Sequence, residues 1–398
     1  MEKMEKIRLR SIIKTNQSNY STKEKWSFVN YLDTGNIIKN KIDTIQYIDL
    51  KENKLPSRAK RKVSYNNIIY STVRPNQLHY GIIKEQPKNF LVSTGFTVIE
   101  VDTKVAIPDY IYYVLSQDEI TEQLQAIGEQ GVSAYPSIKP SDIENLEILL
   151  PSIEIQEKIV SVLSSIDNKI SINDKINNNL EQQISSIFVN MFGAAIDSLN
   201  NNDIKLGDLI ESIDNRGKTP PLSKEPTFYP IIDVKALSGN SRIIDYNNCT
   251  KYVSEETYKT WFRNGHPTKY DILISTVGSI AEMKIFLDDI GCIAQNVVGF
   301  RTKGISALYL YQYLNYIKND LVTYNIGSVQ PSIKVTHIIK HSIYVAPQNK
   351  IDTFDNIAHS ITEKIFANYK ENKRLKEIRD TFLPKLISGE LDISTVKL

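Results

Sequence analysis

Residues 153–191, IEIQEKIVSVLSSIDNKISINDKINNNLEQQISSIFVNM, decide how this chain is organised. The stretch contains neither Pro nor Gly, and its apolar residues recur every three or four positions, the spacing of one helical face. From Ile166 the spacing follows a heptad repeat, in which Asn173 and Asn177 are polar members. At about 1.5 Å per residue the helix would extend about 55–60 Å, farther than a small globular core. The sequence therefore predicts a helix that connects separate parts of the protein, with Gly193 as its stop.

A second stretch, residues 347–388, matches the first when the numbering is shifted by 195 positions. The shift places Ile361 on Ile166, and it places Asn368 and Asn372 on the two asparagines of the first stretch. Each stretch by itself also fits an ordinary amphipathic core helix. The matching polar positions favour two helices that pack on each other as a coiled coil, with the asparagines fixing the register. The expected helix-pairing residues are Ile166, Ile170, Asn173, Asn177, Leu180, Ile361, Ile365, Asn368, Asn372 and Leu375.

The segments that precede the two helices repeat each other as well. Residues 67–73 resemble residues 270–277, and residues 131–139 resemble residues 327–334, while the loops between them differ. Both copies mix short β-branched strands with helices, such as the helix predicted over residues 111–124. The sequence therefore predicts an α+β fold with two globular domains and two long helices. The expected boundaries are 1–150 for the first domain, 151–192 for the first helix, 193–346 for the second domain, 347–388 for the second helix and 389–398 for a C-terminal tail.

Composition and charge limit the class of protein. The chain has 398 residues, of which 41% are hydrophobic and 24% charged, as in a globular protein of two or three domains. It has no apolar run of membrane-spanning length and no apolar secretory segment at its charged start, and Cys249 and Cys292 are too few for a disulfide framework. These features predict a cytoplasmic protein. The net charge is only +2, but the first 62 residues hold 15 Lys and Arg against 7 Asp and Glu, which fits either a nucleic-acid partner or a solvated basic surface.

Basic, aromatic and amide side chains gather in the loops of both predicted domains. The segment KENKLPSRAKRK occupies residues 51–62 of the first domain, and the turn NRGKTPP occupies residues 215–221 of the second. Arg can pair with guanine and Asn or Gln with adenine, while Lys, Ser and Thr commonly hold phosphate. Each residue alone is compatible with a solvated loop, but their occurrence in corresponding regions of both copies favours DNA binding. The predicted DNA-binding residues are Lys60, Arg61, Lys62, Arg74, Tyr80, Tyr135, Lys139, Arg216, Lys218, Thr219, Gln330 and Lys334.

No complete catalytic motif occurs in the sequence. It has no G-x-x-x-x-G-K-[ST] phosphate loop, no G-x-G-x-x-G motif and no Asn/Asp-Pro-Pro-aromatic motif of amino-methyltransferases. His337 and His341 have the spacing of a metal-binding pair, but Ile338 stands where a metalloprotease has Glu. Asp233 and Lys235 fit the end of an Asp-x-Lys nuclease motif, which leaves a nuclease as the alternative from an enzyme class. We therefore predict no catalytic residue, metal or cofactor in this chain.

Several framework segments follow the pattern of one protein family. They are TVRP at 72–75, LPSIEIQEKI at 150–159, GKTPP at 217–221, DILISTVGS at 271–279 and RDTFLPKLISGEL at 379–391. In these segments, and in their order along the whole chain, the sequence resembles the DNA-specificity (S) subunits of Type I restriction–modification systems. The resemblance implies two target-recognition domains that each bind one half of a bipartite DNA site. It also implies that the two helices form an antiparallel coiled coil, relate the domains by a pseudo-twofold axis and set the gap between the half-sites.

The resemblance also implies partners and cofactors. Two methyltransferase (M) subunits would bind the chain, and restriction (R) subunits would join through them. S-adenosylmethionine, ATP and Mg²⁺ would then be held by those partners, while this chain would be non-catalytic and contact double-stranded DNA but no membrane. A specificity subunit of a Type IIB-like system, with different partners, and a scaffold that does not contact DNA remain as alternatives.

Overall fold

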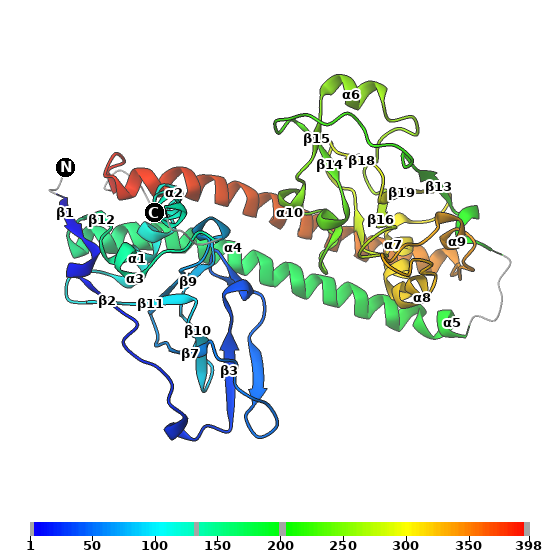
Figure 1. Ribbon diagram of the computed structural model, residues 1–398. Helices are drawn as coiled ribbons and strands as arrows, with labels where there is room; N and C mark the ends of the chain where they lie inside the picture. Colours follow the sequence, from blue (N-terminus) through cyan, green and yellow to red (C-terminus); the bar gives the residue numbers. More distant parts are fainter. Residues whose placement is uncertain (1–3, 131–134, 199–203, 394–398) are drawn as a thin grey trace. The chain divides into compact units, whose positions relative to one another are not determined.

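Two long helices run through the structure. The computed structural model describes residues 4–130, 135–198 and 204–393. Helix α4 spans Ile153–Phe188, and helix α10 spans Gln348–Ile387 (Figure 1). Both helices were expected from the apolar spacing of the sequence, and both are present.

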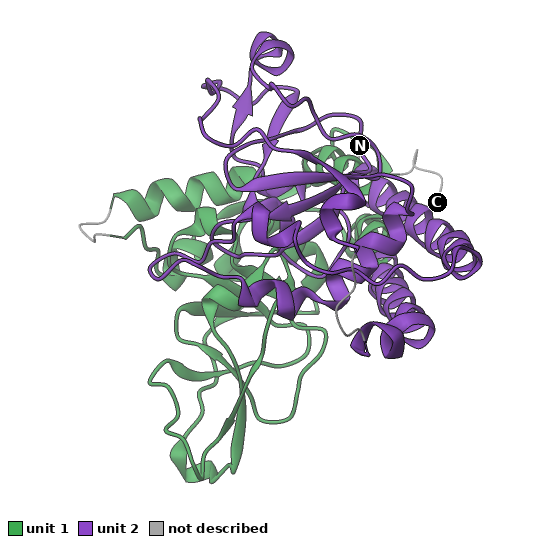
Figure 2. Ribbon diagram, turned by 90° about the vertical axis from the view of Figure 1, so that its right-hand side faces the viewer, with its two compact units in different colours: residues 1–168, 375–398 green, residues 169–374 purple. Residues whose placement is uncertain are grey.

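The chain folds as two compact units, each of which contains part of both long helices. Unit 1 comprises residues 1–168 and 375–398, and unit 2 comprises residues 169–374 (Figure 2). Unit 1 therefore holds the first turns of α4 and the last turns of α10, and unit 2 holds the remainder of both. The domain boundaries expected from the sequence stay a prediction.

Helix α4 is continued beyond the glycine that was expected to stop it. A π-helical turn at Val189–Gly193 and helix α5 at Ala194–Asp197 follow it without a break. Gly193 has helical φ and ψ angles of −53° each, and a Cβ atom there would lie 3.3 Å from the hydroxyl oxygen of Tyr316. The expected stop was therefore wrong, because this glycine permits the close approach of Tyr316 rather than a left-handed helix end.

Unit 1 contains two four-stranded sheets and two smaller strand pairs. Its strands are β1 (Glu5–Arg8), β2 (Ile13–Thr15), β3 (Phe28–Leu32), β4 (Ile37–Ile38), β5 (Lys41–Ile42), β6 (Gln46–Asp49), β7 (Ala59–Lys62), β8 (Ile68–Ser71), β9 (Tyr80–Ile82), β10 (Phe90–Ser93), β11 (Phe96–Val101) and β12 (Glu147–Leu150). The first sheet has the order β2–β11–β8–β9 and is antiparallel throughout. The second has the order β6–β3–β10–β7, with β3 and β10 parallel. The small pairs are β1–β12 and β4–β5.

Unit 2 contains a four-stranded and a three-stranded sheet. Its strands are β13 (Ile210–Ile213), β14 (Tyr229–Ile232), β15 (Tyr252–Val253), β16 (Ile272–Ser275), β17 (Met283–Ile285), β18 (Cys292–Ile293) and β19 (Val297–Thr302). The larger sheet has the order β13–β19–β16–β17 and is antiparallel throughout. The smaller has the order β15–β14–β18, with β14 and β18 parallel.

The two units share one framework. The sheet β2–β11–β8–β9 matches β13–β19–β16–β17 strand by strand, and β6–β3–β10 matches β15–β14–β18. The internal repeat expected from the sequence is therefore confirmed. The units differ beside the second sheet, because unit 1 adds β7 there, whereas unit 2 has helix α6 (Glu255–Thr260) after β15.

Shorter helices complete both units. The helix expected over residues 111–124 is two helices, α1 and α2, because Gln117 between them has an extended backbone with φ −67° and ψ 143°. The remaining α-helices are α1 (Pro108–Leu115), α2 (Asp118–Glu129), α3 (Pro140–Glu144), α7 (Ala307–Tyr316), α8 (Lys318–Thr323) and α9 (Val335–Ile338). The 3₁₀ turns are η1 (Leu9–Ser11), η2 (Thr22–Glu24), η3 (Thr34–Asn36), η4 (Pro75–Gln77), η6 (Leu206–Asp208), η7 (Val234–Leu237) and η8 (Tyr246–Asn248).

Four asparagines, of which Asn173, Asn368 and Asn372 are buried and Asn177 is partly buried, join α4 to α10 inside unit 2. The Asn173 side-chain amide donates to the Asn372 side-chain oxygen over 2.9 Å, and the Asn368 amide donates to the Asn177 oxygen over 2.8 Å. Residue numbers rise along α4 as they fall along α10, so the helices run antiparallel within this unit. Of the other expected pairing residues, Ile170 and Ile365 are buried, while Ile166, Leu180, Ile361 and Leu375 are partly buried.

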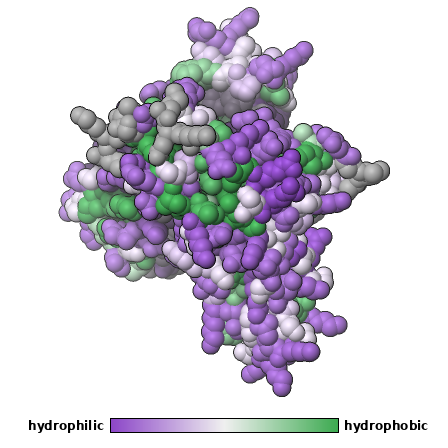
Figure 3. Space-filling model, turned by 90° about the vertical axis from the view of Figure 1, so that its left-hand side faces the viewer, coloured by the Kyte–Doolittle hydropathy of each residue, from purple (hydrophilic) through white to green (hydrophobic). Residues whose placement is uncertain are grey.

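Each unit has an apolar core built against its part of the helix pair. In unit 1, residues of α1 and the first sheet pack with Leu163 of α4 and Leu386 of α10. In unit 2, Phe188 and Phe354 pack with Tyr309 of α7, and burial of each such side chain contributes about 1.5–3 kcal/mol. Over the described residues, no helix is both long and apolar enough to cross a membrane. Figure 3 shows one face on which hydrophilic residues cover most of the area and hydrophobic residues gather in patches.

Candidate nucleic-acid interface

A backbone junction in unit 1 holds the end of β8 against the segment before α3. Residues 72–74 and 136–138 form it through an antiparallel bridge, and we call it the first clasp. Its hydrogen bonds run from Arg74 N to Pro136 O over 2.9 Å and from Ile138 N to Thr72 O over 2.8 Å. Each such bond contributes about 0.5–1.5 kcal/mol, so the first clasp fixes the two segments at one point.

Unit 2 contains the same junction. Residues 276–278 and 331–333 form the second clasp, again with an antiparallel bridge. Its hydrogen bonds run from Gly278 N to Pro331 O over 2.9 Å and from Ile333 N to Thr276 O over 2.9 Å. The matching bonds show that the similar segments found in the sequence occupy equivalent places in the two units. Residues 131–134, which belong to the same sequence similarity, lie outside the described residues.

Exposed polar and aromatic side chains extend from both clasps. In the first, the Arg74 guanidinium lies 4.5 Å from the centre of the Tyr135 ring, and Tyr135 is 57% exposed. Arg74 has a left-handed backbone, with φ +49°, a conformation that is uncommon for residues other than glycine and often marks a functional position. In the second clasp Gly278 takes that place, with φ +84°, and the exposed Gln330 precedes the clasp proline. The clasps thus present different side chains on one backbone frame.

A lysine follows each clasp. Lys139 and Lys334 are both exposed, and each is the N-cap residue of a short helix, α3 or α9. Two predicted DNA-binding residues therefore have equivalent positions, as the repeat required.

The basic segment of unit 1 is linked to the first clasp by backbone hydrogen bonds to residues 94 and 95, which lie between them. Thr94 N donates to the Arg58 carbonyl over 2.8 Å, and Thr72 N of the clasp donates to the adjacent Gly95 carbonyl over 2.8 Å. Arg58 directly precedes β7, which carries the predicted cations. Residues 94 and 95 therefore link the start of this basic strand to the first clasp.

The basic turn of unit 2 reaches the second clasp in the corresponding way. The Gln295 side-chain amide donates to the Thr219 hydroxyl over 2.6 Å, and Thr276 N of the clasp donates to the adjacent Asn296 carbonyl over 2.7 Å. Lys218 is exposed beside Thr219. Each unit thus links one basic segment to one clasp. In such an arrangement the basic segment can contact the phosphates of a duplex while side chains of the clasp contact its bases.

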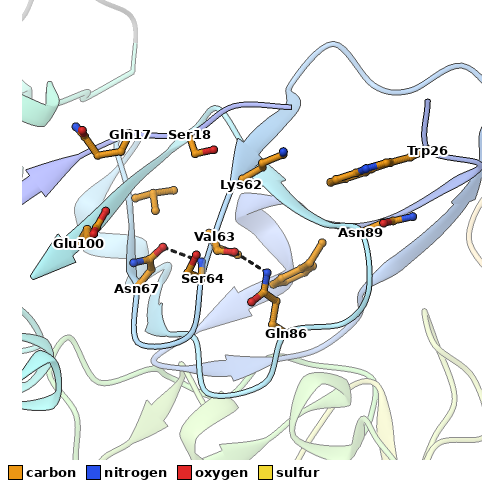
Figure 4. A pocket seen from close by; sticks show the side chains of 12 residues that line it. Gln17, Ser18, Trp26, Lys62, Val63, Ser64, Asn67, Gln86, Asn89 and Glu100 are labelled. Carbon is orange, nitrogen blue, oxygen red and sulfur yellow. Dashed lines mark hydrogen bonds between the residues drawn. The ribbon is translucent and has the colours of Figure 1, made fainter. Parts of the chain in front are cut away.

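The three cations of β7 differ in availability. Lys60 is exposed, whereas the Lys62 ammonium is paired with the Glu24 carboxylate at 2.5 Å and lies 5.3 Å from the Trp26 ring centre. Arg61 is partly buried, and this burial lowers the pKa of its guanidinium. Lys62 lines a cavity of about 290 Å³ among amide side chains, and Figure 4 shows it near Trp26. Within this strand, Lys60 has the side chain best placed to contact phosphate.

Two other predicted residues have partners of their own. The Arg216 guanidinium donates to the Asp214 carboxylate over 2.8 and 2.5 Å. Burial alone would raise the pKa of Asp214, but the hydrogen bonds from Arg216 hold it below its usual value. Tyr80 was expected to contact DNA, but it is only 3% exposed and its ring stacks on Tyr70, so its side chain belongs to the core of unit 1.

Sequence reasoning missed two residues of this candidate interface. Arg58 was part of the basic segment but was not singled out, and Gln295 was not considered at all. Gln295 has φ +56°, an unusual conformation for glutamine, which a sequence does not reveal. The contacts of both residues join segments far apart in the chain, and this is why local patterns did not identify them.

The residues weighed for catalysis have structural contacts. The Asp233 carboxylate accepts a hydrogen bond from the Lys235 backbone N–H over 3.1 Å and caps η7. His341 Nδ1 lies 2.8 Å from the hydroxyl of Tyr324. Across the part of the chain that the structure describes, no group of three or more His, Cys, Asp or Glu side chains could hold a metal ion.

Comparisons with known proteins identify the family of the chain. Residues 1–182 and 199–378 match the family model described as "Type I restriction modification DNA specificity domain". The chain is 26% identical over 440 residues to the Type I restriction enzyme HindI specificity subunit of Haemophilus influenzae, covering 91% of this chain and 94% of that protein. It is 24% identical over 380 residues to the Type I restriction enzyme MjaIX specificity subunit of Methanocaldococcus jannaschii, covering 87% and 84%.

The fold is similar to that of a solved structure. The crystal structure of a Type I restriction–modification system S subunit from M. genitalium superimposes with a TM-score of 0.57 and 17% identity. The similarity covers 97% of this chain and 96% of that one. At this identity the comparison concerns the fold alone.

Proposed function

Because the chain belongs to the Type I restriction–modification DNA specificity family, it recognises DNA sequence through two repeated domains, and we propose that each unit binds one half of a bipartite site. As a specificity subunit it is non-catalytic and directs the chemistry of a restriction–modification complex. The observation that carries the proposal is the repeated clasp, which has matching backbone hydrogen bonds in both units but different exposed side chains.

Some side chains of the interface contact bases, and others contact phosphates. Arg74 in unit 1 and Gln330 in unit 2 contact base edges, because Arg suits the O6 and N7 atoms of guanine and Gln suits the N6 and N7 atoms of adenine. Lys60, Lys139 and Lys218 contact phosphates and position the duplex without selecting a sequence. A clasp held by backbone hydrogen bonds keeps the base-contacting side chains in place whatever those side chains are, so the frame tolerates changes of recognised sequence.

The long helices set the unread gap between the half-sites. They pair as an antiparallel coiled coil with a pseudo-twofold axis near the asparagines. The reciprocal contacts support this proposal: Asn173 pairs with Asn372, the repeat mate of Asn177, and Asn177 pairs with Asn368, the repeat mate of Asn173. A buried asparagine at a heptad position favours one register over its alternatives, because a shifted register leaves the amide without a partner.

The partners supply the chemistry. Two methyltransferase subunits bind the chain, restriction subunits join through them, and S-adenosylmethionine, ATP and Mg²⁺ are held by those subunits. The supporting consideration is the family, whose name describes a DNA specificity domain rather than a catalytic one.

Methylation of DNA by the reconstituted complex tests the function. The purified chain is combined with its methyltransferase partner, and methylated bases are mapped on genomic DNA by single-molecule sequencing. We expect adenine methylation at one bipartite sequence when both proteins are present and none with either alone. Methylation by the purified chain alone, or methylation by the complex without a bipartite sequence, would contradict the proposal.

A further inference from the structure

A loop of unit 2 holds an apolar side chain in water beside the second clasp. The loop comprises residues 325–332, and its residue Val329 is 98% exposed. Among the large apolar side chains in the described part of the chain, none is more exposed. The residue that follows is Gln330, which is also exposed and which we assign to a base contact. Because Val329 is almost fully exposed, it contributes almost nothing to the packing of unit 2.

The loop is closed by its own hydrogen bonds. The Asn325 side-chain oxygen accepts from Gly327 N over 3.0 Å and from Ser332 N over 2.9 Å. Ile326 N donates to the Ser332 carbonyl over 2.9 Å. A Cβ atom on Gly327 would overlap the carbonyl oxygen of Gln330, so the two sides of the loop lie in close contact. These contacts fix the shape of the loop, and binding through it therefore costs little further conformational entropy.

The position of the loop separates Val329 from other exposed apolar residues. Single exposed apolar side chains are common and need no explanation by themselves. The loop of Val329, however, is joined to the second clasp, where Gly278 N donates to the Pro331 carbonyl over 2.9 Å. In the proposed function this clasp faces DNA, so Val329 lies on the surface that contacts the duplex.

The base edges in the major groove offer one methyl group to an apolar side chain. It is the C5-methyl group of thymine, whereas the other positions used for recognition are hydrogen-bond donors and acceptors. Consecutive Cα atoms lie about 3.8 Å apart, close to the rise of about 3.4 Å per base pair, so neighbouring side chains reach the same or adjacent base pairs. An adenine contacted by Gln330 and a thymine contacted by Val329 would then lie in one A·T pair or in two adjacent pairs.

We propose that Val329 is a specificity-determining residue that packs on the C5-methyl group of a thymine in the half-site bound by unit 2. The inference rests on the proposed function and adds to it a base that is recognised through an apolar contact. Burial of one methyl group against the valine favours thymine by about fourfold over a base that lacks this group.

Replacement of thymine by uracil isolates the contact, because uracil lacks the C5-methyl group and keeps the pairing edge. Duplexes are first selected from a random library by the chain assembled with its methyltransferase partner, which shows the recognised bases without assuming their arrangement. Each thymine among them is then replaced singly by deoxyuridine, and the affinity of the complex for each duplex is measured. We expect one replacement, in or next to an A·T pair of one half, to weaken wild-type binding about fourfold.

Two valine variants complete the test. Val329→Ala should bind the thymine and uracil duplexes equally at that position, because alanine lacks the methyl groups that reach the base. Val322→Ala, which truncates an exposed valine of α8 outside the loop, is the matched control and should keep the fourfold difference. Both valines are exposed, so both variants should unfold at the wild-type temperature.

Several outcomes would overturn the inference. They are a selected sequence without thymine, an absence of any uracil effect on the wild-type complex, and a uracil effect that Val329→Ala retains. A Val329→Ala variant that assembles less well with the methyltransferase partner but keeps the uracil effect would also overturn it, because the valine then packs on that protein. Selection of a sequence with only one recognised half contradicts the bipartite site of the proposed function, and the uracil comparison on that half still decides the role of Val329. Selection of no sequence at all contradicts the proposed function and the inference together.

Discussion

The two units share one backbone framework but differ in the side chains that they expose beside the clasp. Both have an antiparallel sheet of the same strand order and a clasp with the same hydrogen bonds. Unit 1 adds the basic strand β7 beside its clasp, whereas unit 2 uses the turn at residues 215–221. The backbone of the clasp is retained between the units, and the exposed side chains beside it are replaced. A specificity protein can therefore change its DNA target without changing its fold.

The units also differ in the ion pairs that involve their parts of the long helices. In unit 1 the Tyr113 hydroxyl donates to Asp167, which also accepts from Arg379, and this ion pair stays partly exposed. In unit 2 the Arg242 side chain is 1% exposed and its partner Glu181 15% exposed. A buried pair tolerates the loss of one member much less than an exposed pair does.

The largest expected effect follows from this difference in burial. Arg242→Met should destabilise unit 2 by about 3–5 kcal/mol, because it leaves the largely buried Glu181 carboxylate without a cation and with only the backbone N–H of residue 242 as a donor. Arg379→Met, the comparison in unit 1, should cost about 1–2 kcal/mol, as its carboxylates remain accessible to water. Urea unfolding of both variants measures this, and Arg242→Met/Glu181→Leu should recover part of the loss. Equal losses of unfolding free energy for the two single variants would show that the two ion pairs do not differ in their contribution to stability, despite their different burial.

The second effect concerns base recognition by the first clasp. Arg74→Ala should cost about 1–3 kcal/mol of binding and relax one base position in one half-site only. Arg74→Lys keeps the charge but not the planar fork, so it should lose specificity nearly as much. Binding to DNA with each half-site mutated in turn provides the measurement. A loss shared by both half-sites would mean that Arg74 holds phosphate instead.

The helices and the repeat could be predicted from the sequence because their signals are local or periodic. The apolar spacing of α4 and the matching asparagines of α10 required no knowledge of distant contacts. The role of Gly193 was predicted wrongly, since the contact with Tyr316 comes from a different part of the chain.

The site was only partly predictable. Arg74, Tyr135 and Lys139 stand out by residue type, and the structure places them together at the first clasp. Arg58 and Gln295 depend on contacts between distant segments, and Arg242 looks like any loop arginine until its burial is known. Tyr80 was selected because it follows Arg74 closely in sequence, yet the short turn between them returns it to the core.

A smaller effect separates neighbouring lysines of β7. Lys60→Ala should weaken binding to all DNA sequences about equally and reduce the slope of log affinity against log salt by about 1. Lys62→Ala should change the slope less, because Glu24 already neutralises the Lys62 ammonium. Binding titrations at four salt concentrations distinguish the two. Equal slopes for both variants would place Lys62, and not only Lys60, at the phosphates.

The smallest effect is a pH dependence confined to unit 2. Burial lowers the pKa of Lys284 to about 8, below its usual value. Between about pH 8 and the usual lysine pKa the unfolded chain binds more protons at this position, so stability should rise as the pH rises through this range. Lys284→Met should remove that rise, whereas Lys60→Met, an exposed lysine of unit 1, should keep it. Thermal unfolding from pH 7.5 to 10 provides the measurement, and a wild-type profile that Lys284→Met leaves unchanged would refute the assignment.

The central claim is that the helices set the gap and the units set the half-site sequences. Four residues inserted after Asn179 lengthen α4 by about 6 Å and rotate the following part by about 40°. Because B-DNA rises about 3.4 Å per base pair and only one helix of the pair is lengthened, the unread gap should grow by about one or two base pairs. Mapping of methylated bases in cells that carry the variant and its methyltransferase partner measures gap and half-sites together. The account predicts a longer gap between two unchanged half-sites, and an altered half-site sequence with an unchanged gap would contradict it.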